Sequence, residues 1–384
     1  KALLYIGENA KINVIHDNGG NVANNAKLNI ERKASGKKET NDSDLQYYGN
    51  IYLSGTNADI EVTDKNSGIE IASGKIEFDQ TNGRGGTLRI ANNNGGSTFA
   101  RSLAMGATII GNGQIDIVNA NSGSLNINAN ITNKTGNVNI NNSGSSKIAP
   151  DAINIRGKVI AQNGDINVTN SNASRFINIA DTLQTNNGNI NITQSKSGSG
   201  GIKLNGALYS SNNITIKNYG NSGIAFNKNI NADGKTSIYD YSTANITIGN
   251  TINTNGLEIQ NTNKGDVNLN GTINANGDVL VQNNTTGKID IKGTLNNSAT
   301  SGTSKIVNES SNTGGINISG KVGAKNATTI TNKGNSLINI TGDIVDNVNG
   351  ITIEQTNTGA NGGISIAKGI TTDGYLTVDN KGQK

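Results

Sequence analysis

The chain of 384 residues contains no cysteine and no tryptophan, and its only proline is Pro150. The absence of cysteine excludes disulfides and thiolate-bound metals. His16 is the only histidine, which leaves few candidates for a nucleophilic triad or an imidazole-ligated metal centre. We therefore expect His16 to be a surface residue, and we expect no metal, no other cofactor and no enzymatic activity.

Hydrophobic residues make up only 33% of the chain and charged residues only 16%, with a net charge of +4. No stretch approaches the roughly 20 apolar residues of a membrane helix, so membrane insertion is not expected. Lysines are interspersed with acids and lack interleaved aromatics, so we expect no nucleic-acid partner. The chain begins at Lys1 without a signal peptide, which suggests a mature fragment of a longer protein.

A pattern of the form apolar-x-apolar-x-x-x-apolar recurs along the second half of the chain. Successive copies start 21 to 27 residues apart, at Ile202, Ile224, Ile246, Val267, Ile289, Ile316, Ile338 and Ile364. A second apolar pair follows about a dozen residues later, usually after a dipeptide such as Asn255-Gly256. Asn-Gly and Asp-Gly favour tight turns. Each repeat is therefore a set of short strands separated by turns.

Alternation with a period of two places every Ile and Val of such a strand on one face. Stacked copies, each pairing in parallel with the next, would bury these residues in a narrow core. An antiparallel sandwich also alternates, but it does not require long matched repeats. We predict an all-β, right-handed parallel β-helix (a β-solenoid) with about 20–27 residues per coil. We expect one continuous solenoid, with irregular coils in residues 1–120 and regular coils in residues 121–384.

A charged segment from Glu31 to Tyr48 interrupts the early repeats and ends in two tyrosines. Loops of this length in a compact repeat are often functional, although a solvated insertion without a role is the alternative. We expect the segment to leave the coil laterally and to offer a contact loop. Its candidate residues are Lys33, Lys37, Lys38, Asp42, Tyr47 and Tyr48.

Seven asparagines begin Asn-x-Ser/Thr sequons with Ile or Val in the middle: Asn130, Asn167, Asn191, Asn213, Asn245, Asn317 and Asn339. Alternation points the middle residue inward and the asparagine and hydroxyl residue outward. These seven are candidates for N-glycosylation. Chance is the alternative explanation, because the chain is rich in Asn, Ser and Thr.

A polysaccharide-cleaving β-helix needs two carboxylates within about 10 Å of each other. The outward position of the first strand in each repeat would hold such a cluster. That row contains Lys203, Ala225, Thr247, Asn268, Asp290, Asn317, Asn339 and Ser365. Asp290 is its only acid, which argues against a tailspike-like or lyase-like enzyme.

The segments 164–169 (Gly-Asp-Ile-Asn-Val-Thr) and 188–193 (Gly-Asn-Ile-Asn-Ile-Thr) resemble the repeats of filamentous-haemagglutinin-like exoproteins of two-partner secretion. The abundance of asparagine is most similar to the high-molecular-weight-type adhesins. The resemblance covers residues 110–384 well and residues 1–110 loosely. The Asn-Pro-Asn-Gly motif of the family's secretion domain is absent, so the fragment would lie downstream of it.

The resemblance implies secretion through an outer-membrane partner barrel and a location at the bacterial cell surface. It also implies adhesion to a host-cell receptor, a glycan or the matrix, and some members of the family carry glycans on Asn. We expect a monomeric adhesin. The alternative is a structural spacer that holds another domain away from the cell.

Overall fold

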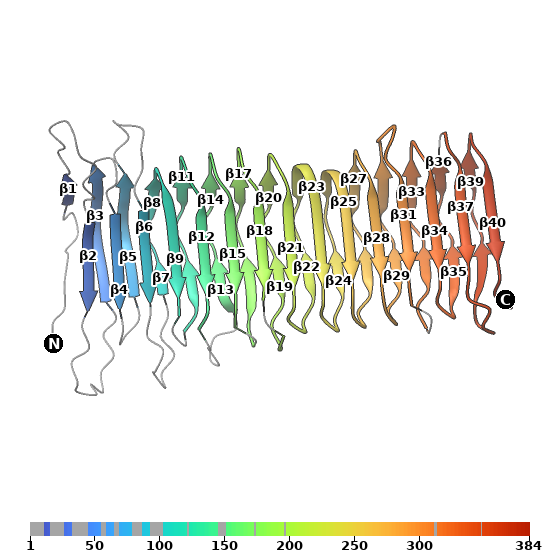
Figure 1. Cartoon of the computed structure of the whole chain (residues 1–384), viewed down its shortest axis with the longest axis horizontal. Helices are drawn as coiled ribbons and strands as arrows, with labels where there is room; N and C mark the ends of the chain where they lie inside the picture. The colour runs from blue at the N-terminus through green and yellow to red at the C-terminus, as the bar shows by residue number, and fades with distance from the viewer. Residues whose placement is uncertain are drawn as a thin grey trace. The chain divides into compact units, whose positions relative to one another are not determined.

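The computed structural model describes residues 11–15, 27–32, 45–54, 59–64, 69–78, 87–92, 103–120, 123–144, 151–172, 174–195, 197–310, 313–346 and 348–384. The regular structure of these residues consists of β-strands, with no helix, and every register between strands is parallel. The chain forms two compact units, residues 1–200 and 201–384. In each unit, successive coils lie side by side in the order in which they occur along the chain (Figure 1).

Unit 1 contains eighteen described strands. They are β1 (Lys11–Ile15), β2 (Lys27–Arg32), β3 (Leu45–Ser54), β4 (Asp59–Asp64), β5 (Ile69–Phe78), β6 (Thr87–Asn92), β7 (Leu103–Met105), β8 (Thr108–Gly111), β9 (Gln114–Asn119), β10 (Leu125–Ile127), β11 (Ile131–Asn133), β12 (Val138–Asn142), β13 (Asp151–Ile155), β14 (Val159–Ala161), β15 (Ile166–Asn170), β16 (Phe176–Ile179), β17 (Leu183–Thr185) and β18 (Ile190–Gln194).

Most coils of unit 2 have a short–short–long order of strands, but in the coils of residues 224–240 and 246–261 the second and third positions form one long strand. Unit 2 contains the remaining strands. They are β19 (Ile202–Leu204), β20 (Leu208–Ser210), β21 (Ile214–Asn218), β22 (Ile224–Phe226), β23 (Ile230–Asp240), β24 (Ile246–Ile248), β25 (Ile252–Asn261), β26 (Val267–Leu269), β27 (Thr272–Ala275), β28 (Val279–Asn283), β29 (Ile289–Ile291), β30 (Thr294–Asn297), β31 (Ser304–Asn308), β32 (Ile316–Ile318), β33 (Lys321–Ala324), β34 (Thr328–Asn332), β35 (Leu337–Ile340), β36 (Ile344–Asp346), β37 (Ile351–Gln355), β38 (Gly363–Ile366), β39 (Ile370–Thr372) and β40 (Leu376–Asn380).

Each coil of unit 2 consists of three strand positions that pair with the same positions of the next coil. Strands β26, β27 and β28 pair in parallel with β29, β30 and β31, which pair in turn with β32, β33 and β34. Paired residues in this unit are separated by 21 to 27 residues, for example 21 between Ile246 and Val267 and 27 between Ile289 and Ile316. The predicted parallel β-solenoid and its coil length are confirmed there.

Coils in unit 1 are longer than predicted near its beginning. Paired residues are 22 apart between Leu103 and Leu125, but 39 apart between Ile12 and Ile51. A parallel ladder fixes only the pairing of strands, so the connections between strands absorb the difference in length. The division of the chain near residue 120 stays a prediction.

The core is a set of apolar rows that run from coil to coil. Ile318 lies between Ile291 and Ile340 in the register, and all three side chains are fully buried. Because paired strands lie about 4.8 Å apart, each aliphatic side chain contacts its equivalents on both sides. Burial of each such side chain contributes about 1.5–3 kcal/mol to stability, so a narrow core is sufficient when it is repeated.

A second buried row lies at the end of the third strand position and is polar. Its members are Asn119, Asn142, Asn170 and Gln194 in unit 1, and Asn218, Asp240, Asn261, Asn283, Asn308, Asn332 and Gln355 in unit 2. Nδ2 of Asn119 donates to Oδ1 of Asn142 at 2.7 Å, and Nδ2 of Asn142 donates to Oδ1 of Asn170 at 3.0 Å. The side-chain oxygen also accepts from the backbone two residues later, as in Gly220 N to Asn218 Oδ1 at 3.0 Å. The row therefore lies where the strands end, and its side chains accept hydrogen bonds from backbone N–H groups of the turns that follow.

Asp240 occupies an asparagine position in this row. Its Oδ1 accepts from Asn218 Nδ2 at 2.9 Å and from the Ser242 N–H at 2.9 Å, whereas its buried Oδ2 has no hydrogen-bond partner in the structure. Burial raises the pKa of Asp240 to about 6, although the hydrogen bonds from Ser242 and Asn218 oppose the increase. The neutral acid therefore fits this row better than the carboxylate does.

Replacement of Asp240 by asparagine should stabilise unit 2 at neutral pH. Between pH 4 and about 6 the native state keeps a proton that the unfolded chain loses, so stability falls as pH rises through this window. The full loss above that window is about 3 kcal/mol. Urea unfolding should show Asp240→Asn to be more stable at pH 7.5 by up to about 3 kcal/mol, with the gain vanishing near pH 4.

The matched control is Asp343→Asn, which changes an exposed acid of the same unit. It should leave the unfolding curve unchanged at each pH. A gain for Asp240→Asn that is equally large at pH 4 and pH 7.5 would contradict the assignment of a buried titrating group.

Candidate binding surface

The outward residues of the first strand position form a straight row along unit 2. The register places the eight predicted residues opposite one another in sequence order: Lys203, Ala225, Thr247, Asn268, Asp290, Asn317, Asn339 and Ser365. The predicted row is confirmed. The neighbours of Asp290 within it are Asn268 and Asn317, so the row provides a single carboxylate.

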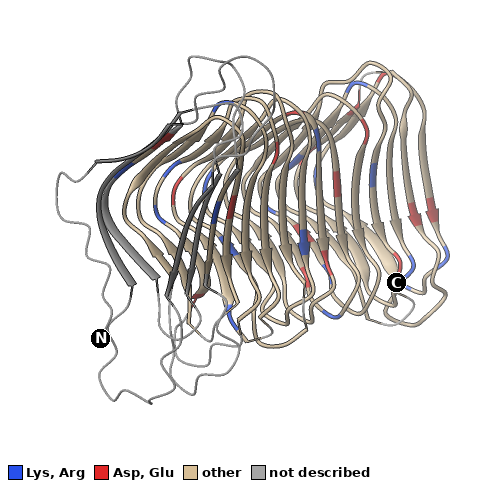
Figure 2. Ribbon diagram, turned by 60° about the vertical axis from the view of Figure 1, so that its left-hand side comes forward, with Lys and Arg blue, Asp and Glu red and all other residues tan. Residues whose placement is uncertain are grey.

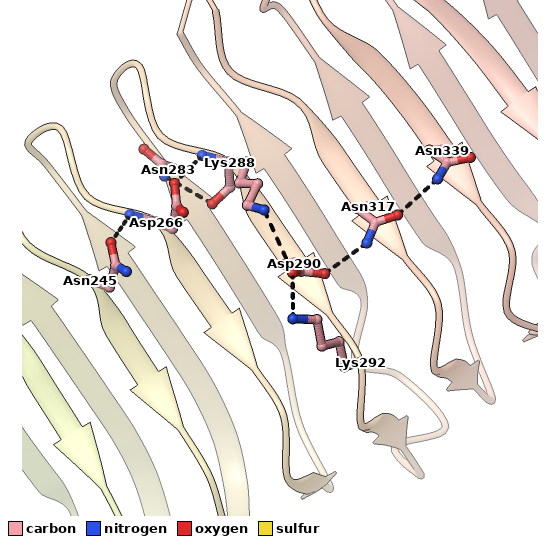
Figure 3. A network of polar contacts seen from close by, with 8 residues as sticks. All are labelled: Asn245, Asp266, Asn283, Lys288, Asp290, Lys292, Asn317 and Asn339. Carbon is pink, nitrogen blue, oxygen red and sulfur yellow. Dashed lines mark hydrogen bonds and ion pairs between the residues drawn. The ribbon is translucent and has the colours of Figure 1, made fainter.

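Asp290 ends a ladder of amides (Figure 3). Its Oδ1 accepts from Asn317 Nδ2 at 2.8 Å, and Oδ1 of Asn317 accepts from Asn339 Nδ2 at 2.9 Å. Its Oδ2 lies 3.1 Å from the Lys292 ammonium and 3.8 Å from the Lys288 ammonium, and the residue is only 2% exposed. A carboxylate has acceptors and no donor, so it can close only the acceptor end of an amide ladder.

Unit 1 contains a second ladder with the same polarity on the outward side of the third strand position. Asn139 donates to Asp116 Oδ1 at 2.7 Å, Asn167 donates to Asn139 at 2.9 Å, and Asn191 donates to Asn167 at 2.9 Å. Gln114 Nε2 also donates to both oxygens of Asp116, at 3.0 and 2.9 Å. These rows direct much of their hydrogen-bonding capacity along the stack, which fixes the side chains and reduces what they offer to a ligand.

Asparagine and aspartate residues at the corners bind the backbone of the next coil instead of its side chains. Oδ1 of Asn130 accepts from the Lys158 backbone N–H of the next coil at 2.9 Å, while the Ile131 N–H donates to the Lys158 carbonyl at 2.8 Å. Asp266 and Val267 bind Lys288 in the same way, since Lys288 N donates to Asp266 Oδ1 at 2.9 Å and Val267 N donates to Lys288 O at 2.9 Å. At these two corners the backbone N–H and C=O of Lys158 and of Lys288 are both bound by the preceding coil.

The seven sequon asparagines divide between these two environments. Asn130, Asn213 and Asn245 lie at corners, are exposed, and accept a backbone N–H of the next coil through Oδ1. Asn167, Asn191, Asn317 and Asn339 lie within strands, are half-buried, and donate through Nδ2 to the preceding coil. The predicted outward orientation holds for both groups, but in the strand group the nitrogen that would carry a glycan already serves a ladder.

The predicted contact loop is only partly described by the structure. Lys33, Lys37, Lys38 and Asp42 lie outside the described residues. Tyr47 and Tyr48 belong to β3, where they pair with Ile71 and Ser73 of β5 on either side of a register shift. The prediction that the loop extends to Tyr48 is wrong, because the strand already begins at Leu45. Tyr47 and Tyr48 have high β-propensity, and residues 45–53 of β3 pair with β5.

A cluster of tyrosines in unit 2 escaped the sequence prediction. Nine outward residues of three adjacent coils form a grid of three by three: Thr215, Lys217 and Tyr219; Ser237, Tyr239 and Tyr241; and Glu258, Gln260 and Thr262. We name this grid the tyrosine platform. Strand spacing and rise make it about 10 Å by 13 Å. The signal in the sequence was Tyr219 and Tyr241, which are one coil length apart.

The side chains of the platform contact one another. The rings of Tyr219 and Tyr241 stack with centroids 4.4 Å apart and planes within 1°, and each residue is 37% exposed. The Lys217 ammonium lies 5.9 Å from the centre of the Tyr239 ring. Glu258 forms an ion pair with Lys235 and accepts from Gln260 Nε2 at 2.5 Å.

The charge state of the platform follows from these contacts. Burial alone would raise the pKa of Glu258, but hydrogen bonds from Lys235 and Tyr239 outweigh it and hold the pKa below its ordinary value. Burial raises the pKa of Tyr241, and the adjacent Tyr219 adds to the effect. At neutral pH Glu258 is therefore an ionised carboxylate, and the phenol of Tyr241 is neutral.

Lys, Arg, Asp and Glu residues are scattered along the described coils (Figure 2). Within the described part of the chain, no group of three or more His, Cys, Asp or Glu residues is close enough to hold a metal ion. No helix among those residues could cross a membrane. His16 lies outside them.

The two environments predict different reactivity of the sequons. When the folded chain is incubated with an N-glycosyltransferase and its sugar donor, Asn130 and Asn245 should be modified severalfold more than Asn167, Asn191, Asn317 and Asn339. Modification of a strand asparagine must break a ladder hydrogen bond, whereas no bond from Nδ2 of Asn130 or Asn245 forms within the described residues. Site occupancy is measured by peptide mass spectrometry.

Proteolytic peptides that contain the same sequons are the control, because they should be modified to similar extents once the coils are gone. Equal occupancy of strand and corner sites in the folded chain would contradict the distinction.

Comparison with protein families, with curated proteins and with solved structures finds no match to this chain. The resemblance to filamentous-haemagglutinin-like exoproteins therefore depends on the sequence repeats alone.

Proposed function

We propose that the chain is a non-enzymatic, secreted surface adhesin whose β-solenoid attaches a bacterial cell to host cells or matrix. The observation that carries the proposal is the strict register of outward side chains, as in the row from Lys203 to Ser365. Equivalent residues recur about every 4.8 Å along such a row. A repeated surface of this kind suits many weak contacts that act together.

The order of the outward side chains supports this proposal. Ladders such as Asp290–Asn317–Asn339 hold the amides in one orientation before any partner arrives. A partner then immobilises few additional rotamers, which lowers the entropic cost of binding. The tyrosine platform adds rigid exposed rings, which contribute contact area at low cost.

The resemblance in the repeats supports the remaining elements of the proposal. These are export through an outer-membrane partner barrel, location at the bacterial surface, and a host-cell receptor or glycan as the partner. A spacer function is the second candidate. Ladders that satisfy their own hydrogen bonds favour it, because a stalk needs a stable surface and no ligand.

A binding experiment separates the two candidates. Labelled chain should bind epithelial cells or immobilised matrix with a saturable curve. Two deletions of one whole coil each then locate the contact: residues 246–266 and, as the comparison, residues 316–337. Each deletion joins equivalent positions, Asn245 to Val267 or Gly315 to Ile338, so the register continues.

An adhesin should lose binding at least tenfold in one of the two deletion variants while far-UV circular dichroism retains the strand signal. Binding that is absent from every cell and matrix surface, or that survives both deletions unchanged, would favour the spacer and contradict the adhesin.

A further inference from the structure

We propose that Tyr219 and Tyr241 form a site of oxidative cross-linking, at which hydrogen peroxide and a haem peroxidase join the two rings into dityrosine. The new carbon–carbon bond connects two adjacent coils of unit 2. The inference goes beyond the adhesin function and does not depend on it. It rests on the positions of the two rings, on the contacts that hold them and on their exposure.

The two rings lie close enough to couple. Their centroids are 4.4 Å apart and their planes differ by 1°, so the ring carbons of one tyrosine face those of the other. The backbone imposes this approach, because the Tyr241 N–H donates to the Asn218 carbonyl at 2.8 Å and Asn218 pairs with Asp240. Tyr219 and Tyr241 therefore hold equivalent positions in adjacent coils, where paired strands lie about 4.8 Å apart. Two groups held in this way react as if each were present at a very high concentration.

Buried residues fix the backbone on both sides of each tyrosine. Asn218 Nδ2 donates to Asp240 Oδ1 at 2.9 Å, which ties together the residues that precede the two tyrosines. Asn218 Oδ1 accepts from the Gly220 N–H at 3.0 Å, and Asp240 Oδ1 accepts from the Ser242 N–H at 2.9 Å. The Cα atoms of the two tyrosines are therefore fixed relative to each other before any oxidant arrives.

Both phenols can be reached from solvent. Tyr219 and Tyr241 are each 37% exposed, so an oxidant at the surface can take an electron from either ring. Burial raises the pKa of Tyr241, and the adjacent Tyr219 adds to the effect. The phenol of Tyr241 is therefore neutral at pH 7, and its proton leaves together with the electron.

The reaction balances as a two-electron oxidation. Each phenol gives up one electron and its O–H proton, which leaves two phenoxyl radicals. The radicals couple through the ring carbons beside the hydroxyl groups, and the hydrogens on these two carbons move to the oxygens. The pair loses two hydrogen atoms in total, and one hydrogen peroxide takes them up to become two molecules of water.

Two other described tyrosines, Tyr209 and Tyr239, have no tyrosine opposite them in the register. Tyr209 pairs with Asn231, and Tyr239 lies in a row between a lysine and a glutamine. Tyr239 is two residues from Tyr241 along the strand, a rise of about 6.6 Å that exceeds the separation of the stacked rings. Among the described residues, Tyr219 and Tyr241 are the one pair of tyrosines with stacked rings.

The bond closes a loop of the chain between two coils. Asn218 and Asp240 are 22 residues apart, and so are the tyrosines that follow them. Coils of a solenoid contact only their neighbours, so the stack opens where two coils separate. A covalent bond at this point opposes the separation and restricts the unfolded chain. Oxidation at this place therefore strengthens the stack.

The test oxidises the whole folded chain and maps the product. A haem peroxidase with hydrogen peroxide is the probe, and N-acetyltyrosine shows in parallel that the reagents couple phenols. Tryptic cleavage at lysine places Tyr219 in the peptide of residues 218–228 and Tyr241 in the peptide of residues 236–264. Mass spectrometry detects the two peptides joined with the loss of two hydrogen atoms.

Four single variants assign the bond. Tyr219→Phe and Tyr241→Phe keep an aromatic ring at each position but lack the O–H group that is oxidised. Tyr239→Phe is the matched control, because it changes the other tyrosine of the same tryptic peptide. Tyr209→Phe is the control for an exposed tyrosine outside the pair, since Tyr209 is 40% exposed.

In the unmodified chain the joined peptides should form within a monomer, as judged on a denaturing gel. Tyr219→Phe and Tyr241→Phe should each reduce their yield at least tenfold, whereas Tyr239→Phe and Tyr209→Phe should keep it within threefold. Three outcomes would overturn the proposal: no joined peptides while N-acetyltyrosine couples, a yield that Tyr241→Phe leaves unchanged, or joined peptides found only in covalent dimers.

Discussion

The structure of each unit depends on in-register parallel pairing between successive coils. A strand of three residues such as β26 has no stability of its own, and it persists because β24 and β29 satisfy its backbone on both sides. The pairing also brings identical chemistry together from coil to coil. Ile289, Ile316 and Ile338 meet in one row because the ladder permits no other neighbours. A change at one coil therefore acts first on the two coils beside it.

The same constraint governs the polar side chains, and it explains the abundance of asparagine. An amide carries both a donor and an acceptor, so a row of amides can bond along the stack in one direction, as Asn139, Asn167 and Asn191 do. An acid has only acceptors, and it is compatible with such a row only at the acceptor end, where Asp116 and Asp290 are found. Asp240 lies inside the buried row, which is why its Oδ2 is left without a partner and its pKa is raised.

The regular part of the fold could be predicted because the spacing of the repeats determines the register and the alternation of apolar residues determines the inward face. The spacing of Ile202, Ile224 and Ile246 gave the ladder, and alternation gave the outward row around Asp290. The ladders themselves could not be foreseen, since the direction of each amide depends on its neighbours in the stack. For the same reason the accessibility of sequon nitrogens at Asn317 and Asn339 could not be predicted from outward orientation alone. Tyr47 and Tyr48 were misplaced because charge in the preceding residues concealed the start of a strand at Leu45.

A departure from the repeat gives one part of a solenoid a surface that the other coils lack. A row of identical side chains offers the same contacts at every coil, and ladders satisfy much of its hydrogen-bonding capacity internally. The tyrosine platform departs from this pattern within three coils, where Lys217, Tyr239 and Gln260 occupy one row in succession. Tyr219 and Tyr241 are each 37% exposed there, and Glu258 forms an ion pair with Lys235. The regular coils supply a rigid base at fixed spacing, and the local change in sequence supplies side chains that differ from those of the neighbouring coils.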